Sequence, residues 1–366
     1  MGDDARYMTR ALALAERAAG FTAPNPMVGC VIVKDGEIVG EGWHRAAGAP
    51  HAEAEALAAA GAKARGATVY VTLEPCNHHG LTPPCSEALI KASVAEVVYA
   101  LPDPNAKAAG GAARLAAGGI KVRHEVCAKE AAYLNRFWLK SITSDRPYVV
   151  AKFAMSLDGK IATRAGASQW ITGPKARARA HQLRQSVDAI IVGAGTLAAD
   201  DPALTARPEG RAAAHPLRIV LDSSARSKPG AKAFERGGKG ALLVTTRAAT
   251  RTRLEAFRGL GVETLCLSAD ERGRPDLGAL LEELKARGAC GVLVEGGGET
   301  LGAFFDVGLV DEVWAFIAPI VIGGGKPAVG GAGVAALADA WSLQEVETER
   351  LGRDLLLRGV VNRRPR

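Results

Sequence analysis

Four residues constrain the fold of this chain more than any other feature of its sequence. His51 and Glu53 stand in HAEAEALAAA, and Cys76 and Cys85 stand in LEPCNHHGLTPPC. One imidazole and two thiolates form a three-ligand set for Zn²⁺ and leave the fourth tetrahedral position open for water. To meet at one metal, a helix beginning at His51 must lie against a strand-to-helix loop that carries both cysteines. Glu53 can then lie beside the metal without ligating it, where a carboxylate suits proton transfer.

The alternative is that a chance His-x-Glu pair stands in the same chain as two buried thiols. The order of the residues favours a metal site, because the signature of zinc-dependent deaminases is H-x-E followed by P-C-x-x-C. Here Pro75 and Cys76 fit, but the second cysteine comes nine residues after the first. This wider spacing, together with PNPMVGCVIVKDGEIVGEGWH at positions 24–44, resembles the deaminase half of the bifunctional riboflavin-biosynthesis deaminase/reductase family.

The resemblance implies a cytidine-deaminase-like three-layer α/β domain over residues 1–145. It implies zinc ligands at His51, Cys76 and Cys85 and a catalytic carboxylate at Glu53. Three further residues lie in loops at the ends of expected strands or helices, where binding sites tend to form. The resemblance implies that Asn25 and His44 hold substrate and suggests the same for Asn105; a turn asparagine or a surface histidine is the alternative from spacing alone.

Bulk properties restrict the class of protein. A chain of 366 residues with 48% hydrophobic and 23% charged residues is expected to form two globular domains. A net charge of +7 suits an anionic ligand or a merely basic protein. Because aromatic residues make up only 5% and do not alternate with runs of Lys and Arg, we expect no nucleic-acid partner.

The six cysteines are too sparse for a disulfide scaffold of this size. The first residues, MGDDARYMTR, lack the apolar segment of a secretory signal, and no apolar run reaches transmembrane length. We therefore expect a cytoplasmic protein without a membrane partner. Enzymes of the resembled family often associate, so a homo-oligomer is expected.

Alternating strand and helix patterns occur twice along the chain. In the first half, Asp35-Gly36 between two short apolar runs is a strong hairpin signal, and the last expected helix ends at Lys140. The polar stretch 143–147 is the expected linker. After it, strands at 148–153, 189–192, 217–221, 241–245, 262–267 and 292–295 alternate with helices, which predicts a largely parallel sheet covered on both faces.

The Gly-rich stretch VEGGGETL, positions 294–301, stands between an expected strand and an expected helix. Such a loop suits an anion, although a simple turn explains it equally well and the G-x-G-x-x-G fingerprint is absent. Read in order with SLDGK, SQWITG and GTLAADDPALTAR, it resembles the reductase half of the same family. The resemblance implies a dihydrofolate-reductase-like α/β domain over residues 146–366 that uses NADPH.

The positions matching that family's NADPH-binding residues are Ala154, Trp170, Thr196, Asp200, Ser223, Gly297, Gly298, Glu299, Thr300, Leu301, Gly302 and Ala303. Those implied to bind substrate are Ser168, Arg184, Leu204, Arg207 and Glu295, with Lys152 as a further candidate near the reacting sugar. Arg184 and Arg207 also suit a phosphate as bidentate donors, whereas surface arginines are the alternative. Ser223, Ser224 and Arg226 could meet an adenosine 2′-phosphate.

The resulting hypothesis is a two-step enzyme that acts on a phosphorylated pyrimidine with zinc and NADPH as cofactors. It deaminates the ring and then reduces the ribosyl group to ribityl. One rival is a nucleobase or tRNA deaminase with an appended nucleotide-binding regulatory domain; another is a non-catalytic nucleotide sensor controlling the first domain. One departure stands out, since Leu81 occupies a position where the family commonly has Arg or Lys, and Leu81 cannot bind the substrate phosphate.

Overall fold

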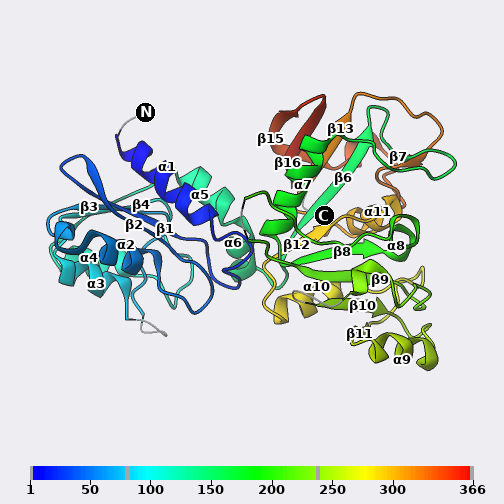
Figure 1. Ribbon diagram of the computed structural model, residues 1–366, viewed down its shortest axis with the longest axis horizontal. Helices are drawn as coiled ribbons and strands as arrows, with labels where there is room; N and C mark the ends of the chain where they lie inside the picture. The colour runs from blue at the N-terminus through cyan, green and yellow to red at the C-terminus, as the bar shows by residue number, and fades with distance from the viewer. Residues whose placement is uncertain (1–2, 79–82, 211, 236–239, 363–366) are drawn as a thin grey trace. The chain divides into compact units, whose positions relative to one another are not determined.

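The computed structural model describes residues 3–78, 83–210, 212–235 and 240–362. The chain divides into two units, Met1–Asp145 and Arg146–Arg366. In Figure 1 the first unit is drawn mainly in blue and cyan, and the second in green to red. None of the helices in the described ranges is both long and apolar enough to cross a membrane.

The first unit contains a five-stranded sheet with the strand order β2-β1-β3-β4-β5. The pair β1–β2 is antiparallel, as is β1–β3, and β3, β4 and β5 are parallel. The predicted hairpin at Asp35-Gly36 is confirmed, and both residues have positive φ, 51° and 81°. That geometry is typical of a tight hairpin turn. The strands are β1 (Gly29–Lys34), β2 (Glu37–Trp43), β3 (Thr68–Val71), β4 (Glu96–Tyr99) and β5 (Lys121–His124).

Helices cover both faces of this sheet, which confirms the predicted three layers. The alternation of β1 shows why: Cys30 and Ile32 pack toward α2, α3 and α4, whereas Val31 and Val33 pack toward α1 and α5. All four side chains are buried. The helices are α1 (Asp3–Glu16), α2 (Ala52–Ala60), α3 (Cys85–Ala92), α4 (Gly111–Ala117), α5 (Ala128–Leu134) and α6 (Arg136–Thr143), with a short 3₁₀ turn, η1 (Gly61–Ala64).

The helix expected to end at Lys140 is two helices that meet at Asn135. The Asn135 side chain accepts a hydrogen bond from the Met27 backbone N–H at 2.8 Å and donates to the Met27 carbonyl at 2.9 Å. Asn135 is 1% exposed, and these two hydrogen bonds connect the junction of α5 and α6 to the loop before β1. Helical periodicity in the sequence does not reveal such an interruption.

The second unit is built on a nine-stranded sheet with the order β11-β10-β9-β8-β12-β6-β13-β16-β15. The strands from β11 to β6 in this order are parallel, as predicted. β13, which was not predicted from the sequence, is parallel to β6, and β16 pairs antiparallel with both β13 and β15. The strands are β6 (Tyr148–Ser156), β8 (Ala189–Gly193), β9 (Leu217–Leu221), β10 (Ala241–Thr245), β11 (Glu263–Cys266), β12 (Gly291–Val294), β13 (Glu312–Ala318), β15 (Ser342–Leu351) and β16 (Asp354–Asn362).

Helices of the second unit pack on the parallel strands. Leu280, Leu281 and Leu284 of α10 and Phe304 of α11 are fully buried in one core with alternate residues of the central strands. The helices are α7 (Pro174–Ser186), α8 (Ala194–Asp200), α9 (Arg251–Gly259), α10 (Leu277–Ala286) and α11 (Gly298–Asp306). Smaller elements are β7 (Lys160–Ala162), which pairs with β14 (Lys326–Pro327), and the 3₁₀ turns η2 (Lys232–Phe234) and η3 (Leu337–Asp339).

Parallel strands bring their carboxyl ends to one edge of the sheet, where α/β proteins bind ligands. Thr196, Ser223 and Glu295 each follow the end of such a strand, β8, β9 and β12 respectively. The fold therefore gathers residues from distant parts of the sequence at one edge.

Candidate functional site

The three predicted zinc ligands converge in the first unit. His51 is the N-cap of α2, and Cys85 is the first residue of α3. The Nδ1 atom of His51 lies 3.2 Å from the Cys85 sulfur and 3.5 Å from the Cys76 sulfur, and the three donor atoms lie within 4.8 Å of one another. Tetrahedral zinc, with Zn–N of about 2.0–2.1 Å and Zn–S of about 2.3 Å, sets its nitrogen and sulfur ligands about 3.6 Å apart. The residues present therefore fit a zinc ion.

Glu53 lies beside this set, near the start of α2, and its residue is only 4% exposed. Burial, and then the charge of the Cys76 thiolate, raises the pKa of Glu53 to about 7. A bound dication opposes this shift, because it favours the carboxylate form. A carboxylate that can hold or release a proton near neutral pH suits general acid–base chemistry.

The two sulfur atoms differ in their surroundings. A hydrogen bond from the Cys85 thiol, followed by one from His51, lowers the pKa of Cys76. The Cys85 backbone N–H also points at the Cys76 sulfur, at 3.4 Å. The pKa of Cys85 is raised, first by its hydrogen bond to Cys76 and then by burial. In the absence of a metal, one proton is thus shared between the pair, and zinc binding would displace it.

Asn25 and His44 lie together near the metal ligands. The Asn25 side-chain nitrogen is 3.3 Å from His44 Nε2, and His44 Nδ1 is 3.1 Å from the Pro50 carbonyl oxygen. Because that carbonyl can only accept, Nδ1 carries the proton, and Nε2 accepts from Asn25. This assignment leaves the oxygen of the Asn25 amide as the acceptor atom of that side chain. The His44 ring also meets the His51 ring edge-on, with centroids 5.6 Å apart.

Asn105 lies in the loop after β4. Its backbone N–H donates to Asp103 Oδ1 at 2.8 Å, and its side-chain oxygen accepts from the Lys107 N–H at 3.2 Å. The side-chain oxygen thus closes a local turn, which is the alternative considered for this residue. Leu81 lies outside the described residues.

In the second unit, Arg184, Glu295 and Lys152 form one charged cluster. Arg184 donates from Nε to Glu295 Oε1 at 2.9 Å and from Nη2 to Oε2 at 2.5 Å, and Lys152 Nζ lies 4.0 Å from Oε2. Burial acts to raise the pKa of Glu295, but the charges of Arg184 and Lys152 outweigh it and hold that pKa well below its usual range. Burial lowers the pKa of Lys152.

The role of Arg184 as a bidentate phosphate donor stays a prediction, but the structure gives its guanidinium other partners. Its fork is engaged by Glu295, and Nη1 donates to the Thr205 carbonyl at 3.3 Å. Arg207 is exposed, and it makes no ion pair with any residue that the structure describes. Leu204, three residues earlier, is 2% exposed and has a φ of 52°, a conformation that few non-glycine residues adopt.

Two contacts join loops predicted to bind cofactor and substrate. Ser168 donates to Asp200 Oδ1 at 2.8 Å, which ties the SQWITG loop to the end of α8. The Gly297 N–H donates to Thr196 Oγ1 at 2.8 Å, which ties the start of α11 to α8. Thr196 and Gly297 are 101 residues apart in the sequence, so folding brings together motifs that are distant along the chain.

The stretch 297–303 is the beginning of a helix rather than an extended loop. Gly297 is the N-cap of α11, which has no side-chain cap there, so free N–H groups at the helix start fit an anionic pyrophosphate. Leu301 is fully buried, and a Cβ at Gly302 would lie 2.3 Å from the backbone of Gly330. The stretch 297–303 thus contains both the helix start and residues that pack in the interior, and its role in binding the cofactor stays a prediction.

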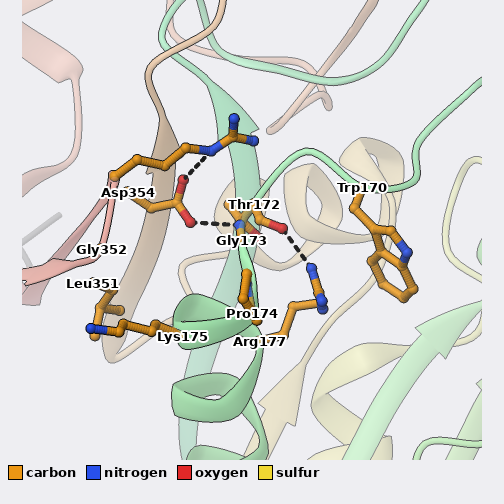
Figure 2. Close-up of a pocket in the computed structure, with 10 residues that line it drawn as sticks. Trp170, Thr172, Gly173, Pro174, Lys175, Arg177, Leu351, Gly352 and Asp354 are labelled. Atoms are coloured by element: carbon orange, nitrogen blue, oxygen red, sulfur yellow. Dashed lines mark hydrogen bonds and ion pairs between the residues drawn. The ribbon is translucent and has the colours of Figure 1, made fainter.

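Trp170 lies at a hollow of about 350 Å³ at the start of α7 (Figure 2). Its indole is 67% exposed, and the Arg177 guanidinium lies 4.5 Å from the ring centroid. On the opposite wall, the Asp354 carboxylate accepts the Gly173 N–H at 2.6 Å and thereby caps α7. An exposed indole beside a cation is a surface on which a planar ring can stack.

Ser223 follows β9, and Ala154 lies in β6 beside Phe316 of β13. The Ser223 carbonyl accepts hydrogen bonds from the N–H and the hydroxyl of Thr246, which fixes the backbone at this end of β9. Arg226 is exposed, and Arg253 donates to the Ser224 carbonyl at 3.0 Å. The end of β9 therefore carries two arginines, of which the sequence had indicated only Arg226.

Two further residues near the sites were not found from the sequence. Glu74, two residues before Cys76, accepts hydrogen bonds from three backbone N–H groups. His181 lies one turn before Arg184 on α7; burial, followed by the charges of Arg184 and Arg207, lowers its pKa to about 4. The sequence signal that could have identified Glu74 is an acidic residue after a buried strand, directly before Pro-Cys.

Comparisons with known proteins agree with this geometry. The profile of the cytidine and deoxycytidylate deaminase zinc-binding region matches residues 1–101, and that of the RibD C-terminal domain matches residues 147–357. The riboflavin biosynthesis protein RibD of Actinobacillus pleuropneumoniae is 42% identical over 98% of this chain and 95% of its own length. The RibD protein of Escherichia coli is 43% identical over 97% of this chain and 98% of its own length.

Solved structures extend the comparison to the fold. Acinetobacter baumannii RibD superposes with a TM-score of 0.87 at 39% identity and covers 99% of both chains. A diaminohydroxyphosphoribosylaminopyrimidine deaminase/5-amino-6-(5-phosphoribosylamino)uracil reductase from Thermotoga maritima gives a TM-score of 0.85 at 34% identity, covering 98% of this chain and 99% of that one. The chain therefore belongs to the RibD family of bifunctional deaminases and reductases of riboflavin biosynthesis.

Proposed function

We propose that this chain catalyses two consecutive steps on one phosphorylated pyrimidine. The unit 1–145 deaminates 2,5-diamino-6-ribosylamino-4(3H)-pyrimidinone 5′-phosphate with zinc. The unit 146–366 then reduces the ribosyl group with NADPH and yields 5-amino-6-ribitylamino-uracil 5′-phosphate. The observation that carries this proposal is the convergence of His51, Cys76 and Cys85 within 4.8 Å beside a buried carboxylate, Glu53.

In the deaminase, His51 Nδ1 and the two thiolates would hold zinc, and zinc when bound supplies Lewis-acid activation of a water molecule. Glu53 takes a proton from the attacking water on a carboxylate oxygen and delivers it to the ring nitrogen; it then takes a second proton from the hydroxyl group added to the ring carbon and delivers it to the amine, which leaves as ammonia. Its burial keeps bulk water from competing for that proton. Asn25, with its nitrogen held by His44, offers its amide oxygen to a donor group on the ring.

In the reductase, NADPH supplies the hydride. The start of α11, Thr196 and Asp200 would hold the cofactor, and the exposed Trp170 would stack on one of its rings. Lys152 and Glu295, fixed by Arg184, would orient the hydroxyl groups of the sugar. Arg207 would bind the phosphate, because its guanidinium is exposed and without an ion pair in the described ranges.

The setting proposed for this enzyme is the cytoplasm, and the proposed assembly is a homo-oligomer. Free cysteines at the zinc site support a reducing compartment. The proposed partner is the small phosphorylated substrate alone, with neither nucleic acid nor membrane.

Metal analysis and mass spectrometry of products, with and without NADPH, test this function. We expect about one zinc per chain, a deaminated product without NADPH, and a product carrying two further hydrogens when NADPH is added. Deamination without any NADPH oxidation would favour a regulatory second unit. Steeply salt-dependent RNA binding would favour a tRNA deaminase. Absence of both reactions with zinc bound would overturn the proposal.

A further inference from the structure

Glu74 is a buried carboxylate in the first unit that has no cation as a hydrogen-bonding partner in the part of the chain that the structure describes. The residue is 8% exposed. Its Oε1 accepts from the Gly110 N–H at 3.2 Å and the Ala112 N–H at 2.9 Å, and its Oε2 accepts from the Asp103 N–H at 3.2 Å. Burying a carboxylate is costly, so three backbone donors from one segment indicate a specific task.

The segment bound by Glu74 is residues 103–112, here called the covering segment. It reaches from Glu74 to the metal ligands, because Ala108 packs in one buried cluster with Cys76 and Cys85. The Asn77 N–H also donates to the Ala108 carbonyl at 2.9 Å. The covering segment is therefore fastened on both sides of Cys76, by a carboxylate two residues before it and a backbone bond one residue after it.

The contact between the covering segment and the zinc loop is close. A Cβ added at Gly111 would lie 1.7 Å from the Pro75 carbonyl oxygen, so only glycine fits there. The residue next to Cys76 therefore touches the backbone of the covering segment directly. A small shift of the segment would move Pro75, and with it the thiolate that follows.

The chemistry of the side chain at position 74 matters for this contact. An ionised carboxylate only accepts hydrogen bonds, so both oxygens can face N–H groups. A glutamine would turn one NH₂ group toward a backbone N–H, which leaves at least one buried donor unpaired. The glutamine variant would therefore lose the free energy that it costs to leave one buried polar group without a hydrogen bond.

We propose that Glu74 is a positioning residue for the zinc site: by binding three N–H groups of the covering segment, it seats Ala108 over the Cys76 and Cys85 sulfurs and fixes their spacing. This inference rests on the zinc site of the proposed function. Groups outside the ligand set that orient the ligands change metal affinity by about 10–100-fold. Glu74 acts through the backbone and touches neither metal nor substrate.

The test is the rate at which the zinc-loaded full-length protein releases zinc to an excess of a chromogenic chelator, measured well below its melting temperature. We expect Glu74→Gln to release zinc at least about tenfold faster than the unsubstituted protein. Glu87→Gln is the matched control, because Glu87 pairs with Arg114 between α3 and α4 and is 45% exposed. It should release zinc at the unsubstituted rate.

A second control separates positioning from a general loss of stability. Val98 is fully buried in the cluster that faces α1, away from the covering segment, so Val98→Ala should lower the melting temperature without accelerating zinc release. If Glu74→Gln does not fold, Glu74→Asp provides a second test, because it keeps the charge but shortens the side chain so that it cannot reach all three N–H groups. Zinc release from the folded variant at the unsubstituted rate, or equally fast release from Val98→Ala, would overturn the inference. A protein that binds no zinc at all would instead refute the proposed function.

Discussion

Arg184 and Glu295 form a two-pronged ion pair between α7 and the end of β12, with side chains only 15% and 7% exposed. Lys152, at 4.0 Å from the same carboxylate, adds a second positive charge. The pair links a helix that precedes β8 with a strand that follows it by about a hundred residues, and it holds Glu295 ionised at the edge of the sheet where the cofactor is expected.

Breaking this pair should destabilise the second unit. Arg184→Met leaves a buried carboxylate with Lys152 as its remaining cation, and we expect a loss of roughly 3 kcal/mol in the free energy of unfolding. The double variant Arg184→Met/Glu295→Gln should recover part of it, because the buried carboxylate is gone and the remaining cation, Lys152, can lose its proton. Chemical denaturation of both variants measures the difference; equal losses would show that packing rather than charge is responsible.

The same ion pair gives the second unit a pH dependence. The pKa of Glu295 is lower in the folded than in the unfolded protein. The contribution of the ion pair to the free energy of unfolding is therefore present at pH values above the unfolded pKa of Glu295, about 4.3. It is lost as the pH falls toward the folded pKa. Acid titration followed by denaturation should show a smaller loss of stability between about pH 4 and about pH 2 in the double variant. An identical acid response would remove Glu295 as the source.

Glu53→Gln should retain zinc and lose deamination by a factor of at least about 100, because the proton carrier is removed while the ligands remain. Cys76→Ser should lose zinc and deamination together. Reduction of pre-deaminated substrate should be unchanged in both, since the second unit has its own core. Near-normal deamination by Glu53→Gln would contradict the proton-transfer role.

Arg207→Ala should raise the reductase KM about tenfold to a hundredfold for the phosphorylated substrate, the worth of one charge-assisted hydrogen bond. Its effect should vanish with a substrate that lacks the phosphate, and deamination should be unaffected. Arg251→Ala is a control, because Arg251 is a 90%-exposed arginine that pairs with Glu255, one turn away on the same helix. An equal KM increase for both substrates would show that Arg207 does not bind the phosphate.

Preference for NADPH over NADH is expected from the two arginines at the end of β9. Arg226→Ala should lower the ratio of kcat/KM for NADPH to that for NADH by about tenfold, through the loss of a cation for the 2′-phosphate. Arg253→Ala provides a second test of the same kcat/KM ratio, since the Nη1 atom of Arg253 already donates to the Ser224 carbonyl. An unchanged ratio in the Arg226 variant would remove the 2′-phosphate argument.

The zinc ligands could be predicted because metal coordination requires particular residue types, and a histidine and two thiols in this order are rarely assembled by chance. The parallel part of the second sheet could be predicted because its strands are short apolar runs between helices. The hairpin of β15 and β16 was missed: SLQEVETERL is polar and mostly exposed at the edge of the sheet, so it carries no apolar alternation.

Other features depend on partners that a linear pattern does not specify. Arg184 was predicted to bind a phosphate, and its sequence context does not show that folding places it against Glu295, 111 residues away. Glu74 binds backbone N–H groups 29 to 38 residues further on. Every residue type except proline carries the same backbone N–H, so the sequence does not indicate which of these groups a side chain will bind. The roles of Asn25, His44 and the cofactor-binding positions remain predictions.

The position of β6 has a consequence for how the protein is made. β6 is the first strand of the second unit to leave the ribosome, yet its neighbours in the sheet, β12 and β13, are synthesised more than 130 residues later. The second unit therefore cannot close its core until most of its chain exists, and such distant pairing makes folding slow. The first unit pairs β1 to β5 over a short stretch, so it can fold and acquire zinc while the second is still being translated.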